Sequence, residues 1–112
     1  MSIVHKLREF YLTAYLVGKK LPKRERFGLW GKIETVILEV LVLLIEAGLS
    51  SKINKLPILE RTRIKIETIK QLVRLSNEGK IIEEKAYLDQ QNQLQEISRM
   101  LNGWIRYTQK EP

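Results

Sequence analysis

The feature that most limits the fold is an apolar run, Val36–Ile45, in which nine of ten residues are apolar. The run contains Glu39 and is flanked by Glu34 and Glu46, so it falls far short of the roughly 20 residues needed to span a bilayer. A helix that is apolar nearly all round, yet too short to cross a membrane, is a buried helix. Because so little of it is polar, we expect it in the core of a soluble homo-oligomer rather than a monomer.

The rest of the chain has helical periodicity and predicts three more helices. In the first, apolar residues recur at three- and four-residue steps from Ile3 to Val17, and Gly18 is expected to take the left-handed position that ends it. The second helix is expected from Pro22–Lys23 to Ala47, with Gly48 as the stop. Gly28 and Gly31 are unfavourable inside a helix, so they mark either a late start of this helix or close backbone packing. The other two helices are expected from Pro57 to Asn77–Gly79, after a polar loop at Ser50–Leu56, and over about Glu83–Gln109.

Four helices joined by short loops pack as antiparallel neighbours, so the expected fold is all-α. It is an antiparallel up-down-up-down four-helix bundle that forms one domain over residues 1–112. The third helix has a core stripe and, off that stripe, a second apolar line that hints at a subunit contact. The stripe is Leu59, Thr62, Ile66, Ile69 and Val73, and the second line is Ile64, Leu72 and Leu75.

The charge of the chain points to a polyanion partner. Twenty Lys and Arg against 13 Asp and Glu give a net charge of +7, which suits nucleic acid or an anionic membrane, although many small helical proteins are simply basic. The absence of cysteine excludes disulfides and Cys-based zinc sites and fits the cytoplasm. The N-terminal residues lack the apolar segment of a signal peptide. We therefore expect a cytoplasmic protein.

The inventory of side chains does not favour an enzyme. His5 is the only histidine, and it is expected at the surface. A di-metal bundle needs Glu-x-x-His pairs, and the sequence contains none. Glu34 and Glu39 could face inward as an acid pair, or could lie on a narrow polar strip and meet Lys or Arg of a neighbouring helix. We expect no catalytic residues, no metal and no cofactor.

A basic segment precedes the apolar run. Residues 19–32, which we call the basic elbow, include six Lys or Arg with only Glu25 to pair with locally, and they predict contact with phosphate groups. On the third helix three more basic residues share one flank, where they either extend this surface or form ordinary intrahelical ion pairs. The candidate nucleic-acid-binding residues are Lys19, Lys20, Lys23, Arg24, Arg26, Lys32, Arg63, Lys70 and Arg74.

The elbow also contains two aromatic residues. Phe27 and Trp30 lie three apart and could stack on bases, as in single-strand-binding proteins, but large aromatics at helical spacing more often fill a core. We therefore expect both in the core. Trp104 is also expected there, with Gly103 allowing a neighbouring helix to approach.

Three stretches of the chain together resemble a known family. They are Leu21–Leu29, Arg74–Glu78 and Ile97–Ile105, and they are similar to the accessory variability determinant (Avd) proteins of diversity-generating retroelements. These proteins belong to a wider group of four-helix bundles that includes the ribosomal RNA intervening-sequence proteins. The stretch Glu39–Gly48 departs from the signature of the intervening-sequence branch and looks more like the Avd branch.

The resemblance implies a homopentameric barrel and a function. Avd-like proteins bind the reverse transcriptase of the retroelement and its template RNA, or an RNA–DNA hybrid, to support mutagenic cDNA synthesis. Lys23, Arg24, Arg26 and Arg74 match charged positions of the family. The alternative is a structural oligomer or protein–protein adaptor with no nucleic-acid role.

Overall fold

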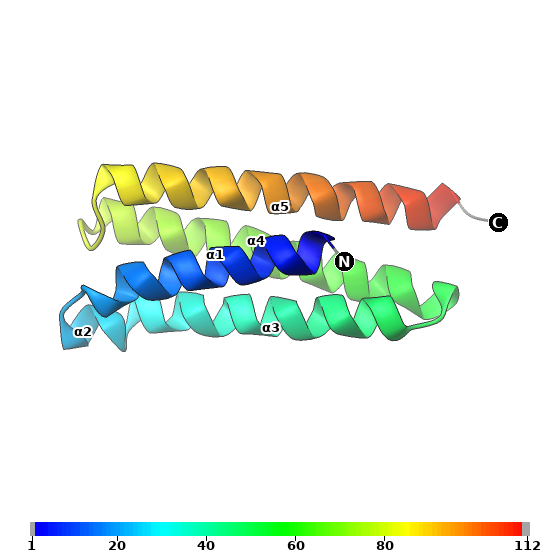
Figure 1. The fold of residues 1–112 in the computed structure, drawn as a ribbon, viewed down its shortest axis with the longest axis horizontal. Coiled ribbons are helices and arrows are strands. Elements are labelled where there is room, and N and C mark those ends of the chain that lie inside the picture. The colour runs from blue at the N-terminus through cyan, green and yellow to red at the C-terminus, as the bar shows by residue number, and fades with distance from the viewer. Residues whose placement is uncertain (1, 111–112) are drawn as a thin grey trace.

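Four long helices and one single-turn helix make up residues 2–110, the part of the chain that the computed structural model describes (Figure 1). Their bounds are α1 Ser2–Lys19, α2 Lys23–Arg26, α3 Leu29–Leu49, α4 Lys52–Glu78 and α5 Glu84–Lys110. No strand occurs within these residues. The prediction of an all-α bundle of four long helices is confirmed.

Each long helix packs against two others, and together the helices form an elongated bundle of 50 × 21 × 19 Å. The neighbouring pairs are α1 with α3, α3 with α4, α4 with α5, and α5 with α1. In Figure 1, α2 and the loop between α4 and α5 lie at one end, and the turn between α3 and α4 lies at the other, beside the C-terminal end of α5. The 18-residue α1 begins short of that second end, whereas the 27-residue α5 reaches it.

The predicted apolar stripes form the core. On α4 all five residues of the stripe, including the polar Thr62, are buried. Thr62 is accommodated because its hydroxyl donates a hydrogen bond to the Ile58 carbonyl at 2.8 Å. On α1, Ile3, Leu7, Phe10 and Ala14 are buried and Val17 packs against the core edge; on α5, Leu94, Ile97 and Leu101 are buried. The core is thus built from one face of each helix.

The expected second helix is divided in two. Pro22 precedes the one-turn α2, and Phe27–Gly28 separates α2 from α3, which begins at Leu29. A Cβ at Gly28 would lie 2.6 Å from the Arg24 carbonyl oxygen, so the chain can make this tight corner only where a side chain is missing. The start expected at Pro22–Lys23 therefore belongs to the separate helix α2, and the alternative of a late start marked by the glycines is confirmed for α3.

The expected loop at Ser50–Leu56 is largely helical. The helix α4 begins at Lys52 and continues through Pro57. Its first turn is held by Ser51, whose carbonyl accepts hydrogen bonds from the backbone N–H groups of Asn54 and Lys55 at 3.1 and 3.0 Å. The Asn54 amide also donates to the Ser51 hydroxyl at 3.1 Å. These contacts start the helix one turn before the proline.

Three glycines do not have their expected roles. Gly18 is buried inside α1, with no left-handed backbone, and a Cβ there would lie 2.6 Å from Cδ1 of Trp30. The helix α3 continues past Gly48 to Leu49. No atom of a neighbouring helix lies within 4 Å of a Cβ position at Gly103, so that glycine does not mediate a close approach. Among the described residues, the left-handed backbone is found at Lys80, with φ of 58°.

Some apolar and acidic residues lie outside the core. Ile64 and Leu75 of the second apolar line are exposed, at 64% and 51%, while Leu72 is partly buried. Glu39 bonds the Lys65 ammonium of α4 at 3.2 Å. The alternative in which Glu39 faces inward as part of an acid pair is therefore wrong. The alternative in which Glu39 pairs with a basic residue of a neighbouring helix is confirmed.

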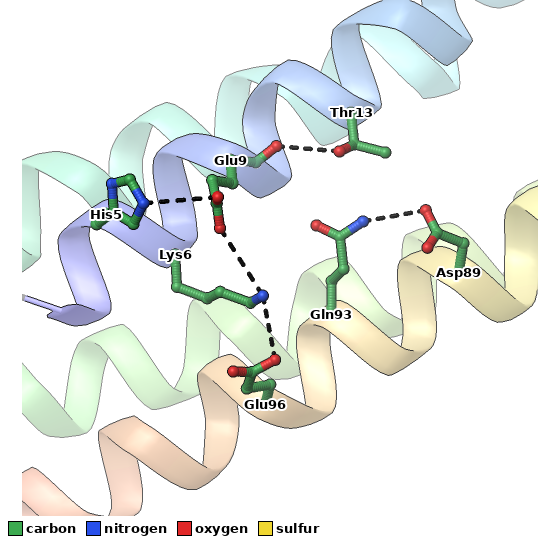
Figure 2. Close-up of polar contacts among 7 residues, drawn as sticks. All are labelled: His5, Lys6, Glu9, Thr13, Asp89, Gln93 and Glu96. Atoms are coloured by element: carbon green, nitrogen blue, oxygen red, sulfur yellow. Dashed lines mark hydrogen bonds and ion pairs between the residues drawn. The ribbon is translucent and has the colours of Figure 1, made fainter.

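Polar contacts join α1 to α5 (Figure 2). The Lys6 ammonium of α1 lies between two carboxylates, at 3.1 Å from Glu96 of α5 and 3.8 Å from Glu9. His5 points to Glu9 of its own helix at 3.5 Å and is exposed, as predicted. Within residues 2–110, none of the helices combines the length and apolarity needed to cross a membrane.

Candidate nucleic-acid interface

Trp30 fixes the position of the basic elbow against the core. Its side chain is fully buried, and its indole N–H donates a hydrogen bond to the Ala14 carbonyl of α1 at 2.8 Å. Gly18 leaves room for the indole beside α1. The prediction that Trp30 belongs to the core is confirmed. The start of α3 is thereby held rigidly next to the end of α1.

Phe27 lies on the surface, so the prediction that it belongs to the core was wrong. Its side chain is 74% exposed, and the Arg26 guanidinium lies 5.6 Å from its ring centroid, a cation–π contact. Residues three apart share a face only on a continuous helix, and the break at Phe27–Gly28 removes that relation to Trp30. Trp104 is intermediate: it is partly buried, with the Lys55 ammonium 5.8 Å from its ring centroid.

An open hollow of about 560 Å³ lies at this corner. It brings together one basic residue from the end of α1, one from α2 and one from the first turn of α3, with Phe27 beside them. Its lining residues are Tyr15, Lys19, Arg26, Phe27, Gly28, Gly31, Lys32, Glu34 and Thr35. Three of the nine predicted site residues therefore meet in one place.

The charges of the elbow are not neutralised by the rest of the described chain. Lys19, Lys20, Lys23, Arg24 and Lys32 are exposed and form no ion pair with residues 2–110. Lys32 lies in the first turn of α3, where the helix dipole disfavours a cation. Gly28, the N-cap of α3, has no side chain to satisfy the first backbone N–H groups. The local potential is therefore positive and suits an anion.

Glu34 is an acidic residue among the basic residues of the hollow. It lines the hollow and forms no hydrogen bond or ion pair with residues 2–110. Partial burial raises the pKa of the Glu34 carboxyl, and the nearby Arg26 charge opposes that increase. An unpaired carboxylate here leaves an acceptor available to a ligand that carries N–H donors.

The predicted basic residues of α4 have a different environment. Arg63 bonds Glu60 at 2.6 Å, and Lys70 bonds Glu67 at 2.9 Å, both on the same helix. Lys70 also lies 3.5 Å from the Gln95 side-chain oxygen of α5. The interpretation of these two as intrahelical ion pairs is confirmed. Arg74 is exposed and forms no ion pair within residues 2–110, and none of the three lines the hollow.

A second notable surface is apolar and runs over α1 and α3. Both helices carry exposed apolar side chains, and a groove of about 180 Å³ lies between them, lined by residues that include Tyr11, Leu12 and Leu38. The exposed apolar residues of these helices are Leu12, Tyr15, Leu16, Leu38, Val42, Ile45 and Leu49. An apolar face of this extent is typical of a protein-protein interface.

Sequence reasoning overlooked part of the hollow. Gly28 and Gly31 were expected within or at the start of a helix, but both line the hollow, and a Cβ at Gly31 would lie 2.9 Å from the Arg26 carbonyl oxygen. The signal was present in the sequence, because Pro22, Gly28 and Gly31 interrupt a helix within ten residues. No group of three or more metal-ligating side chains occurs within the described residues.

Comparison with known proteins identifies a family over almost the whole chain. A family model described as bAvd-like matches residues 1–108, which include the four long helices almost to the end of α5. No curated protein matches the chain.

Proposed function

The chain belongs to the bAvd-like family, and on this premise we propose that it is a non-enzymatic accessory protein of a diversity-generating retroelement. In this role it binds template RNA or an RNA–DNA hybrid, together with the cognate reverse transcriptase, in the cytoplasm. Its contribution to mutagenic cDNA synthesis is to hold these partners together rather than to catalyse a step.

The observation that carries the proposal is the basic elbow. Its exposed lysines and arginines have no carboxylate partner within residues 2–110, so binding phosphate groups does not require breaking an ion pair. Release of counterions from the nucleic acid then supplies affinity with little dependence on sequence. Arg74, which also forms no ion pair within residues 2–110, adds a further positive charge on α4.

The proposed assembly is a homopentamer of antiparallel four-helix protomers. The apolar face of α1 and α3 supports self-association, because a protomer alone leaves Leu12, Val42 and Ile45 in water. A closed ring repeats one elbow in every subunit, and a nucleic acid that contacts several elbows binds much more tightly than to one. The reverse transcriptase is expected to bind a different face from the elbow.

The test is RNA affinity as a function of salt, measured with the full chain by fluorescence anisotropy. We expect log K to fall linearly with log salt concentration. The mass in solution, measured by light scattering, should correspond to five subunits. A protein that binds the reverse transcriptase but shows no salt-dependent RNA binding would instead be the structural adaptor, and the function proposed for the elbow would be wrong.

A further inference from the structure

The hollow at the α2–α3 corner has a chemical composition that phosphate binding alone does not explain. A pure phosphate site has donors and positive charges, but this hollow also contains an exposed aromatic ring, Phe27, and a carboxylate, Glu34. The ring has no role in the core, and the carboxylate repels phosphate. Both groups therefore point to a ligand that has a flat face and N–H donors as well as negative charge.

We propose that this hollow binds one unpaired base of a single-stranded nucleic acid, with guanine preferred. The base stacks on Phe27, its Watson–Crick edge meets the Glu34 carboxylate, and the flanking phosphates contact Lys19 and Lys32. This inference rests on the proposed function, since it specifies how the elbow contacts nucleic acid.

Stacking is favoured by the position of Phe27. Its ring is 74% exposed, at the corner between two helices, and the Arg26 guanidinium beside it can stack on a base as well. Gly28 and Gly31 also line the hollow. Because neither has a side chain, a flat ligand can approach the backbone there more closely than at other residues.

The preference for guanine follows from the carboxylate. Guanine has two adjacent N–H donors on its Watson–Crick edge, at N1 and at the exocyclic N2, and a carboxylate can accept both. Adenine and cytosine place a ring acceptor beside their amino group, and uracil places carbonyl groups on both sides of its N–H. Glu34 forms no hydrogen bond or ion pair with the described residues, and the charge of Arg26 lies nearby. In the partly buried position of Glu34, hydrogen bonds from a base are stronger than in water.

The hollow also accounts for the phosphates on each side of the base. Lys19 comes from the end of α1 and Lys32 from the first turn of α3, so they reach it from two different helices. Neither lysine has an ion-pair partner within residues 2–110. The first backbone N–H groups of α3 have no side-chain cap, so they can also donate hydrogen bonds to a negatively charged phosphate.

The experiment uses the full chain and two labelled 12-nucleotide RNAs, one all uridine and one with a single central guanosine. Affinities are measured by fluorescence anisotropy over a range of salt concentrations. The variants are Phe27→Ala, Phe27→Trp and Glu34→Gln. Tyr107→Ala is the control, because Tyr107 is also exposed, at 64%, but lies near the C-terminal end of α5, at the opposite end of the bundle.

We expect wild type to bind the guanosine RNA about tenfold more tightly than the uridine RNA. Phe27→Ala should weaken binding by about 5- to 100-fold without changing the salt slope, because stacking involves no counterions. Phe27→Trp should retain the affinity, Glu34→Gln should remove the preference for guanosine, and Tyr107→Ala should change neither.

Four results would overturn the inference. Unchanged affinity in Phe27→Ala, with binding still sensitive to Lys19→Ala and Lys32→Ala, would leave the proposed function intact and refute stacking. A preference for guanosine that persists in Glu34→Gln would refute the role of the carboxylate. A change of oligomeric mass in Phe27→Ala would show that the hollow is a subunit contact. No binding by wild type would refute the proposed function itself.

Discussion

At the α2–α3 corner, Lys23, Arg24 and Lys32 are exposed and form no ion pair within residues 2–110, whereas on α4 Arg63 and Lys70 each bond a glutamate three residues earlier. Both regions are rich in basic residues. They differ in the backbone beneath them. On a long helix, a carboxylate placed three residues away lies beside its basic partner.

The corner offers no such pairing. Glu25 is the one acidic residue of α2 and forms no ion pair within the described chain, because the positions three and four residues away from it are Leu21, Pro22, Gly28 and Leu29. The comparison shows that the number of basic residues is a poor guide to a polyanion site. What matters is whether the local structure brings carboxylates to them.

The largest difference between the two regions is expected in RNA binding. Replacing Lys23, Arg24 and Arg26 together by Ala should lower affinity on the order of 100-fold and reduce the salt slope by about two to three, since three phosphate contacts are lost. The matched variant is Arg63→Ala with Lys70→Ala, which should change affinity by less than about threefold. Fluorescence anisotropy over salt measures both. Equal losses would mean that paired and unpaired basic residues contribute alike.

The second difference concerns glycine. Gly28→Ala should lower the free energy of unfolding by about 1–3 kcal/mol, because the new Cβ would lie 2.6 Å from the Arg24 carbonyl oxygen and the corner must shift. On α5, the new Cβ of Gly103→Ala would have no neighbouring atom within 4 Å. This substitution should raise the free energy of unfolding by about 0.5–1 kcal/mol, because alanine favours a helix more than glycine does.

Urea unfolding of these two variants, at one fixed protein concentration, measures both effects. A stabilising Gly28→Ala would mean that the corner is less tightly packed than described. A destabilising Gly103→Ala would indicate that another subunit approaches α5 at this residue.

A third prediction concerns a buried polar residue in the regular part of α5. Gln90 is fully buried, and neither its Nε2 nor its Oε1 has a hydrogen-bond partner among residues 2–110. Gln90→Met should therefore raise the free energy of unfolding by about 1–2 kcal/mol, because unsatisfied polar atoms are replaced by apolar ones of similar volume.

The control for Gln90 is Gln93→Met. Gln93 donates a hydrogen bond to Asp89 at 3.0 Å near the surface, and its replacement should have an effect within about 0.5 kcal/mol. Thermal and urea unfolding compare the two. Destabilisation by Gln90→Met would show that Gln90 acquires a polar partner in the assembled protein.

The smallest effect is expected at Glu34. Because burial raises the pKa of its carboxyl above the ordinary value of 4.5, the folded state retains the proton to higher pH than the unfolded state. The contribution of Glu34 to the free energy of unfolding is therefore fully present below the ordinary pKa of the carboxyl. This contribution is lost as pH rises through the folded-state pKa.

Glu34→Gln removes this titration, so the gain in Tm of the variant over wild type should be greater at pH 7 than at pH 4. Thermal unfolding at the two pH values measures it. A gain that is the same at both pH values would indicate that the carboxyl is not desolvated.

Much of the bundle was predictable from the sequence. The stripe on α4 was named residue by residue and is buried in full, because repeats at three and four residues leave one face of a helix apolar whatever its neighbours are. Trp30 was also correctly placed. The intrahelical ion pairs of Arg63 and Lys70 were one of the two alternatives that the sequence left open.

The candidate site was only partly predictable. Its basic residues could be listed, but Phe27 was expected in the core, and the hollow that joins Lys19, Arg26 and Lys32 was not expected. These residues come from three helices, and their proximity depends on a corner whose geometry is set by contacts between Gly28 and the backbone of α2. Spacing along one helix contains no information on such contacts.

The sequence by itself therefore determined that this protein is helical, which faces of its helices are buried, and that it carries a surplus of positive charge. Those properties depend on local periodicity and on composition. Only the tertiary structure decided where the α2–α3 corner breaks, that Phe27 faces solvent, and that an unpaired carboxylate lies among the basic residues. The physical reason is that each of these depends on close packing between segments from different helices, above all Trp30 against α1 at Ala14 and Gly18.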